Sequence, residues 1–252
     1  MLKRFTAMAC AAAMLATPAL SEALRAVTYE GLSPFTREAS ADLPGFNVEL
    51  MNAVAARAGY ELQTEYLPWK RAQKVAAEEA DTLIFGLGRN ATREPKYKWV
   101  MNLLTAESVF VSTSGSIDSL DAARDLGRIG SRSLYFTQLE KEGFTNLENS
   151  DIVNNLKKLK AGRVDAVYTV SSRAVFVWSQ DLGYDPNELT IGASIAPVTI
   201  WLAAHKDFDE AKVAKLQAAL KDVVADGTYE TIHKKYFGVL PILDLCAADC
   251  NS

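Results

Sequence analysis

The sequence predicts an α/β fold of two lobes, each a mainly parallel sheet flanked by helices, with a two-segment hinge between them. Short apolar runs alternate with helical patterns in two successive blocks, and such alternation is typical of parallel sheets covered by helices. A stretch of small polar residues, Ser112 to Ser116, separates the two blocks. An extended segment then runs into Pro197 and leads the chain back. Two crossings of this kind form a hinge around a cleft.

The first block starts near residue 22 and ends at residue 112. Its clearest helix covers residues 46–58, where apolar residues recur at helical spacing before Gly59. Residues 61–66 alternate in polarity as a half-buried strand does, and residues 69–80 are rich in Ala and Lys. The expected elements, in chain order, are strand 27–29, helix 46–58, strand 61–66, helix 69–80, strand 83–85 and strand 107–112.

The second block repeats the pattern, and the chain then returns to the first lobe. Gly143 and Gly162 follow two of the expected helices, and glycine is common just past a helix end. The expected elements are strand 128–130, helix 133–142, strand 146–148, helix 151–161, strand 165–170, helix 171–180, an extended segment 189–196, strand 199–204, amphipathic helix 207–225 and helix 229–236. The first lobe is assigned to residues 22–112 and 197–240, the second to 113–196, and a tail to 241–252.

Residues 1–21 are expected to be a secretory signal peptide. Lys3 and Arg4 precede a mostly apolar run, and small residues come before a cut expected after Ser21, or otherwise after Ala23. The run is too short to remain as a membrane-spanning helix. The mature protein is therefore expected in the periplasm. Its formal net charge moves from −4 to −6 when Lys3 and Arg4 are lost, and this balance gives no reason to expect nucleic-acid binding, which needs a concentrated basic face.

Cys246 and Cys250 are the cysteines that remain after processing. In an oxidising compartment they are expected to form one short-loop disulfide, with two free thiols or metal ligands as alternatives. A metal site needs further ligands, and the two histidines, His205 and His233, stand at no ligand spacing from the cysteines. Neither a metal nor a cofactor is therefore expected.

Arg93 is the leading candidate for a binding residue. It follows an apolar strand and the small residues Gly86 and Gly88. A guanidinium offers a rigid fork of donors that fits a carboxylate through two bonds, and glycine lets a ligand approach the backbone closely. The segment predicts an anion site at the end of the strand, although the segment taken alone fits a solvated surface arginine better, so the rest of the chain must supply the context.

Four collinear segments carry a resemblance to a known family: residues 44–59, 89–100, 159–168 and 225–238. The chain resembles the periplasmic solute-binding proteins of polar amino acid ABC transporters, which form family 3 of the extracellular binding proteins. The resemblance covers residues 25–238. It implies a two-lobed, type II-like periplasmic binding protein fold, a small-molecule ligand, an inner-membrane ABC permease as partner, and a monomer without enzymatic activity.

The resemblance also implies a set of ligand-binding residues. The family's carboxylate-binding arginine falls on Arg93. An aromatic residue of lobe one should lie over the ligand, and the closest positions are Phe35 and Trp69, which fit a core role as well. Lobe two should add backbone donors and a hydroxyl at a helix start, near Ser131 and Ser133. Gly86 also matches the family.

Departures from the family pattern bear on the ligand. Val170, next to Thr169, stands where many members have an aspartate that holds the ligand's ammonium group. Gly88 stands where a small hydroxyl residue is usual. A standard α-amino acid would therefore lose a charge-assisted bond of about 1.5–3 kcal/mol. Arg173 and Arg71 are candidates for the cleft instead, and they would favour a second acid group on the ligand.

Two other functions remain open from the sequence. Some proteins that resemble this family are secreted cyclohexadienyl dehydratases, and a carboxylate such as Glu30 or Glu107 would then supply the acid. The other is a sensory or accessory protein that passes the ligand state to a partner. The leading hypothesis is a binding protein that closes on a small carboxylate-bearing solute and is not an enzyme.

Overall fold

The computed structural model describes most of the chain after residue 21. It describes residues 22–29, 31–37, 42–238, 240, 242–243 and 245, without the side chains of Ser133 and Leu134. The expected signal peptide, Glu30 and the pair Cys246 and Cys250 lie outside the described residues. No helix in the described ranges is long and apolar enough to cross a membrane.

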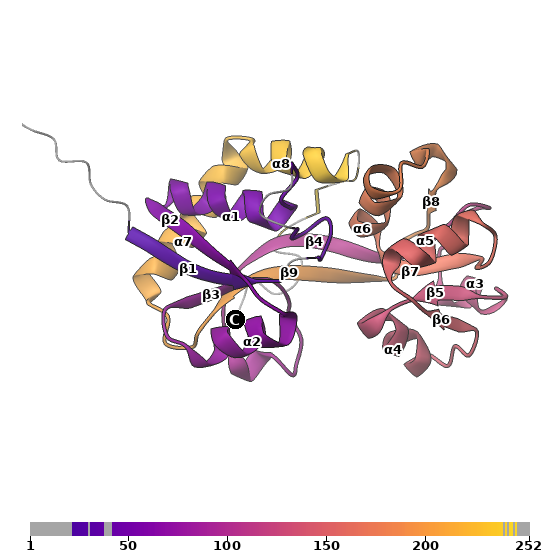
Figure 1. The fold of residues 1–252 in the computed structure, drawn as a ribbon, viewed down its shortest axis with the longest axis horizontal. Helices are drawn as coiled ribbons and strands as arrows, with labels where there is room; N and C mark the ends of the chain where they lie inside the picture. The colour runs from indigo at the N-terminus through magenta and orange to yellow at the C-terminus, as the bar shows by residue number, and fades with distance from the viewer. Residues whose placement is uncertain are drawn as a thin grey trace, which may run out of the picture.

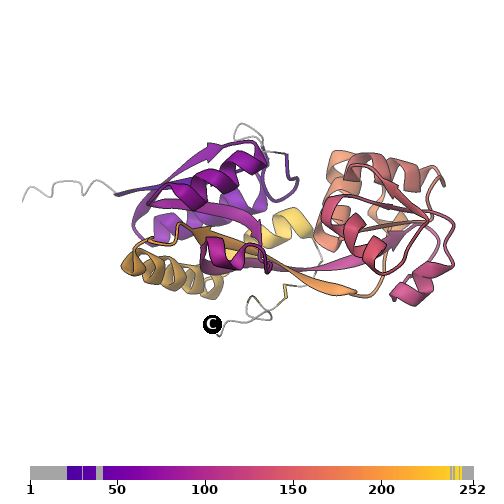
Figure 2. The ribbon, with the colours of Figure 1, turned by 90° about the horizontal axis from the view of Figure 1, so that it is seen from below.

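The chain folds into two α/β lobes linked by two long strands, as Figure 1 shows. Figure 2 shows the same two bodies after a turn of 90° about the horizontal axis, again joined by these strands. The linking strands are β4 (Lys98–Ser112) and β9 (Ala196–Ala204). The predicted two-lobed α/β fold is therefore confirmed.

Lobe one has a mixed sheet with helices on both faces. Its own strands β1 (Glu22–Thr28), β2 (Tyr60–Tyr66) and β3 (Thr82–Gly88) are parallel to one another, whereas β3 runs antiparallel to β9. The helices are α1 (Phe46–Arg57), α2 (Trp69–Glu78), α7 (Glu210–Ala225) and α8 (Thr228–Phe237). Alternate strand residues separate the two faces, because Leu83 and Phe85 pack with α1, α7 and α8, whereas Ile84 packs with α2.

Lobe two repeats the plan on a smaller scale. The end of β4 pairs antiparallel with β7 (Ala166–Val170), and β5 (Ile129–Ser131) lies parallel to both β7 and β6 (Leu147–Asn149). The short strand β8 (Thr190–Ile191) also pairs with β4. The helices are α3 (Leu120–Arg124), α4 (Ser133–Lys141), α5 (Ile152–Lys160) and α6 (Ser171–Phe176), and α6 continues as one π-helical turn, η2 (Val177–Asp181).

The first crossing between the lobes lies inside strand β4. The sequence predicts this crossing at Ser112–Ser116, but Val109 and Val111 already pack in the core of lobe two. The antiparallel pairing with β9 carries the backbone from one lobe to the other and runs from Lys98 to Ser108. The predicted lobe limits stay a prediction, because β4 pairs with strands of both lobes.

A second contact joins the lobes beside the strands. The ring of Phe176 in lobe two stacks on that of Tyr236 in α8, with centroids 6.0 Å apart. Asp181, at the end of η2, accepts a hydrogen bond from Ser33 Oγ at 3.0 Å and lies 3.6 Å from the guanidinium of Arg37. Helix α6 therefore touches lobe one directly, as Figure 1 shows for α6 and α8.

Candidate functional site

The carboxyl ends of the strands in the two lobes face each other. Strand β4 runs from lobe one into lobe two, and β3 and β1 run in the same direction because two antiparallel pairings separate β3 from β4. Strand β7 is antiparallel to β4, so β7, β5 and β6 point back towards lobe one. Ligands of open α/β sheets bind outside these strand ends. The region between the lobes is therefore the expected ligand-binding region.

Arg93 lies at this region, one turn beyond the end of β3. Its backbone N–H donates to Asn90 O at 2.9 Å and to Asn90 Oδ1 at 3.1 Å, which fixes the turn. Its Nη1 donates to Gly88 O at 2.7 Å, and its guanidinium carbon lies 6.0 Å from the centre of the Trp69 ring. Among the described residues no carboxylate lies within ion-pair distance of Arg93.

Burial lowers the pKa of the Arg93 guanidinium, and the nearby Tyr97 acts in the opposite direction. A half-buried cation that has lost part of its water and has gained no carboxylate is a favourable place for an anion. The sequence identified this residue, and the structure adds that its fork is held in place by the strand end beneath it.

One aromatic ring, that of Trp69, stands next to Arg93, and a second ring stands next to Trp69. Trp69 opens helix α2 and is half-buried against the cluster on that face of the sheet. The ring of Tyr29, the residue after β1, lies 6.4 Å from the Trp69 ring. Sequence reasoning missed Tyr29 as a site residue because it placed Tyr29 inside the expected strand 27–29, whereas β1 ends at Thr28. Arg71, two residues after Trp69, is exposed on α2.

Phe35 does not lie among these rings. It is 3% exposed and packs against Phe237, with ring centroids 6.1 Å apart, inside the core of lobe one. The expectation that Phe35 offers its ring to a ligand does not fit this burial, because a core side chain has no free face. Trp69 is therefore the better placed of the two predicted aromatic residues.

The two glycines before Arg93, Gly86 and Gly88, have different structural roles. Gly86 is buried at a bulge between β3 and β9, with a φ of 81° that side chains rarely adopt. A Cβ there would also lie 3.3 Å from Nδ2 of Asn47. Gly88 has an ordinary backbone, and a Cβ would lie 3.7 Å from Nη1 of Arg93. Gly88 is thus directly beside the guanidinium, whereas Gly86 serves the bulge.

The predicted hydroxyl residues of lobe two are mostly engaged within the lobe. Ser131 is 1% exposed, and its Oγ donates to Tyr168 O at 3.2 Å. Thr169 is buried in β7, opposite Val109 of β4. Ser133 opens α4 at the strand end that faces lobe one, and its side chain is outside the described atoms.

Arg173 of α6 is the other predicted arginine that the structure brings to this region. Its Nε is buried and has no hydrogen-bond partner. Burial lowers its pKa, and the groups that act on it electrostatically include Tyr135 of lobe two and Tyr29 of lobe one. Burial raises the pKa of Tyr135 to about 12. Tyr29 is therefore close enough to act on Arg173 electrostatically, and its ring is 6.4 Å from that of Trp69, which adjoins Arg93.

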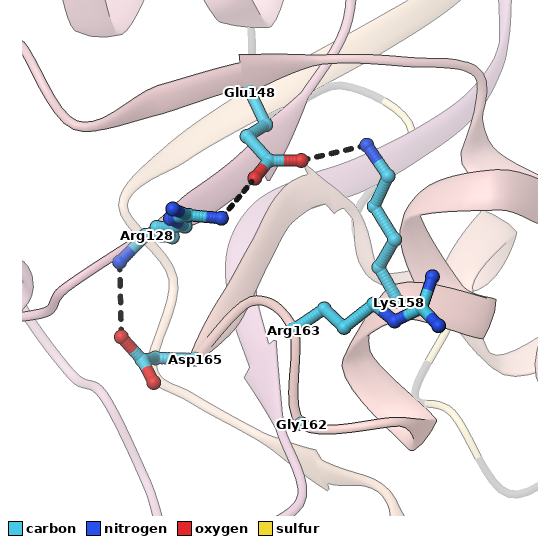
Figure 3. A pocket seen from close by; sticks show the side chains of 6 residues that line it. All are labelled: Arg128, Glu148, Lys158, Gly162, Arg163 and Asp165. Atoms are coloured by element: carbon cyan, nitrogen blue, oxygen red, sulfur yellow. Dashed lines mark hydrogen bonds and ion pairs between the residues drawn. The ribbon is translucent and has the colours of Figure 1, made fainter.

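A separate charged depression lies in lobe two, and Figure 3 shows the side chains that line it. There Glu148 pairs with Lys158 at 2.6 Å and with Arg128 at 3.3 Å, and Asp165 accepts a bond from the Arg128 backbone at 2.9 Å. Arg128 precedes β5 and Asp165 precedes β7, so this depression is at the amino ends of the strands. None of the predicted ligand-binding residues lines it.

Metal ligands do not gather in the described part of the chain. No group of three His, Cys, Asp or Glu side chains lies close enough together there to hold an ion. Glu107, the other carboxylate that the sequence singled out, is half-buried on β4 opposite Pro197, at the crossing between the lobes.

Comparison with known proteins identifies relatives over most of the chain. Residues 24–239 match the profile of the bacterial extracellular solute-binding proteins, family 3. A probable histidine-binding protein of Neisseria gonorrhoeae is 25% identical, over 90% of this chain and 87% of that protein. The L-cystine-binding protein TcyA of Bacillus subtilis (strain 168) is 26% identical, over 84% of this chain and 78% of that protein. An ancestral cationic amino acid solute-binding protein shares the fold, with a TM-score of 0.72 and 18% identity over 85% of this chain and 95% of the other.

Proposed function

Because this chain belongs to the bacterial extracellular solute-binding proteins of family 3, we propose that it binds a small polar solute with a carboxylate group between its lobes. We further propose that it delivers this solute to the permease of an ABC transporter. The relatives are named as histidine-binding and L-cystine-binding proteins. Binding of a polar amino acid or a related acid is the shared element.

The single observation that carries this proposal is the state of Arg93. Its guanidinium is half-buried at the strand ends of lobe one, it is oriented by Gly88 O at 2.7 Å, and no described carboxylate neutralises it. A bidentate carboxylate would replace the water that the guanidinium has lost and would add two charge-assisted hydrogen bonds. Trp69 and Tyr29 supply an apolar wall for the rest of the solute.

Lobe two completes the site when the lobes close. Its strand ends face Arg93, and α4 begins there at Ser133 with its free backbone N–H groups. The solute contacts lobe one first, and contacts with lobe two form only as β4 and β9 bend. Such differential contact is what shifts a two-state equilibrium towards the closed form.

We propose that the protein acts as a monomer in the periplasm and does not catalyse a reaction. The signal peptide expected at residues 1–21 would direct export, and the relatives above are binding proteins rather than enzymes. Turnover of prephenate by the pure protein would contradict this assignment and favour the dehydratase alternative with Glu107 as a candidate acid.

Isothermal titration calorimetry against a panel of amino acids and small organic acids tests the proposal. At least one carboxylate-bearing member of the panel should bind, and Arg93→Ala should abolish that binding while the variant keeps the wild-type melting temperature. Arg163→Ala, an exposed arginine of lobe two, is the matched control. If no member of the panel binds, or if Arg93→Ala binds as tightly as the wild type, the proposal is wrong.

A further inference from the structure

We infer that Arg173 forms a second anion-binding point opposite Arg93, and that the solute is a small dicarboxylic acid. One carboxylate binds the guanidinium of Arg93 in lobe one, and the other binds the guanidinium of Arg173 in lobe two. This inference depends on the proposed function, because both arginines serve the same site between the lobes.

The first argument is that Arg173 is buried without a partner. Its Nε is shielded from solvent and makes no hydrogen bond. No described carboxylate lies within ion-pair distance of its guanidinium. The hydroxyl of the preceding Ser172 is also buried and has no partner. Buried polar groups in proteins are nearly always paired, and those that are not need an explanation. A ligand that arrives between the lobes supplies the missing acceptor.

The second argument is the charge around Arg173. Arg132 acts on it as a second positive charge, and Asp151 is the one carboxylate among the described groups that acts on it. Asp151 is already engaged, because it caps helix α5 by accepting bonds from Asn154 N at 2.9 Å and from Asn154 Nδ2 at 2.5 Å. This part of lobe two therefore keeps an excess of positive charge, which favours an anion and disfavours an ammonium group.

The third argument is position. Arg173 follows the carboxyl end of β7, and Arg93 follows the carboxyl end of β3. These two strands point towards each other, as the pairing of β4 requires. Tyr29 of lobe one acts electrostatically on Arg173, and its ring lies 6.4 Å from that of Trp69, which adjoins Arg93. The two guanidinium groups thus belong to the two facing sets of strand ends, with Trp69 and Tyr29 on the side of lobe one.

A solute with a single acid group cannot pair with both guanidinium groups. It would pair with Arg93 and leave Arg173 further desolvated as the lobes close, and an unpaired buried charge is strongly unfavourable. The residue that ends β7 is Val170, which has no carboxylate to offer to an ammonium group. An acid at each end of the solute meets both cations, and its apolar carbon chain lies against Trp69 and Tyr29.

Calorimetry with matched ligand pairs tests this inference. The pairs are glutarate with its monoamide, and L-glutamate with L-glutamine, and a series from malonate to adipate covers the chain length. The wild type should bind the diacid of the best pair about tenfold or more tightly than its monoamide, because a charged acceptor is replaced by a neutral one. Arg173→Gln should weaken the binding of the diacid by a similar factor and leave the affinity for the monoamide within about threefold of the wild-type value. Arg173→Lys should give an intermediate loss, and Arg163→Gln should give none.

The outcomes separate this inference from the proposed function. If monoacids bind as tightly as diacids in the wild type, and Arg93→Ala abolishes both, the proposed function stands and the second anion point is refuted. If no member of the panel binds, the proposed function fails and this inference fails with it. The preference of the wild type for the diacid over its monoamide tests the second anion-binding point even if Arg173→Gln does not fold. Raised salt should reduce this preference, because two ion pairs produce it.

Discussion

At the scale of single residues, the site depends on the shape of the cation as well as on its positive charge. Arg93 is held by Gly88 O and faces Trp69, so one edge of its fork stays available to a ligand. A lysine at the same position would keep the charge and lose the two-point geometry. The shape of the guanidinium therefore matters as much as its sign.

Arg93→Lys should accordingly weaken the binding of the preferred acid by about tenfold or more, which is about 1.5 kcal/mol. Arg93→Ala should weaken it further. Calorimetry measures both affinities, and Arg163→Lys in lobe two is the matched control. Equal affinities for the wild type and Arg93→Lys would show that only charge, and not the bidentate geometry, is used.

His233 is the residue that links folding to pH. It is 4% exposed in α8, between the rings of Phe46, Tyr229 and Phe237. Burial lowers its pKa, so the folded protein keeps it neutral at a pH where the unfolded chain binds a proton. Its stabilising effect is present above about pH 6.5, the ordinary histidine value, and is lost as the pH falls towards the lowered value.

The free energy of unfolding should therefore decrease between pH 7.5 and pH 5.5, with a contribution from His233 of at most about 1.4 kcal/mol per pH unit. Urea unfolding at a series of pH values measures this slope. Both His233→Phe and His233→Gln remove the titrating group, so both should show a smaller slope, whatever their stability at pH 7.5. A slope unchanged in both variants would contradict this assignment.

The sequence predicted Arg93 correctly as a residue near a strand end because the strand, the glycines and the arginine are adjacent in the chain. It left Phe35 open between a ligand surface and the core, because its partner Phe237 is about 200 residues away. Tyr29 was missed for a similar reason, since its neighbour Trp69 comes from a distant segment. Contacts between segments far apart in the chain are not visible in local patterns.

At the scale of elements, local patterns were sufficient for the longer helices. The helix expected at 46–58 is α1 (Phe46–Arg57), and the one expected at 69–80 is α2 (Trp69–Glu78). The strand expected at 107–112 is only the end of β4, which begins at Lys98. The earlier part of β4 is stabilised by antiparallel pairing with β9, which lies far away in the sequence. Helix α3 (Leu120–Arg124) was also missed, because five residues are too few for a periodic pattern.

The bulge in β3 gives an element-scale prediction. Gly86→Ala should decrease the free energy of unfolding by about 1–3 kcal/mol, because a positive φ is unfavourable for alanine and its Cβ would lie 3.3 Å from Asn47. Gly88→Ala is the control, since its Cβ would make an ordinary contact at 3.7 Å. Thermal unfolding of both variants measures the difference. A Gly86→Ala protein as stable as the control would show that the bulge adapts to a side chain.

At the scale of the whole molecule, the linking strands and the contact beside them decide how the lobes move. Strand β4 pairs with strands of both lobes, β9 pairs with β4 as far as Ser108, and α6 touches α8 through Phe176 and Tyr236. The ion pair of Arg37 with Asp181 is partly exposed, and such pairs contribute about 0–1 kcal/mol. This small energy leaves the angle between the lobes open to control by a ligand.

Closure on a diacid should therefore be visible in solution. The radius of gyration from small-angle X-ray scattering should decrease when the preferred acid is added to the wild type, because Arg93 and Arg173 then bind one molecule from opposite lobes. Arg93→Ala should show no decrease at the same concentration, since the first contact is lost. Arg173→Gln should retain part of the binding and show a smaller decrease, because lobe one still binds an acid while lobe two gains less from closing. A wild-type protein that binds the acid with no change in its radius of gyration would mean that the two arginines do not meet across the hinge, and that the ligand contacts one lobe alone.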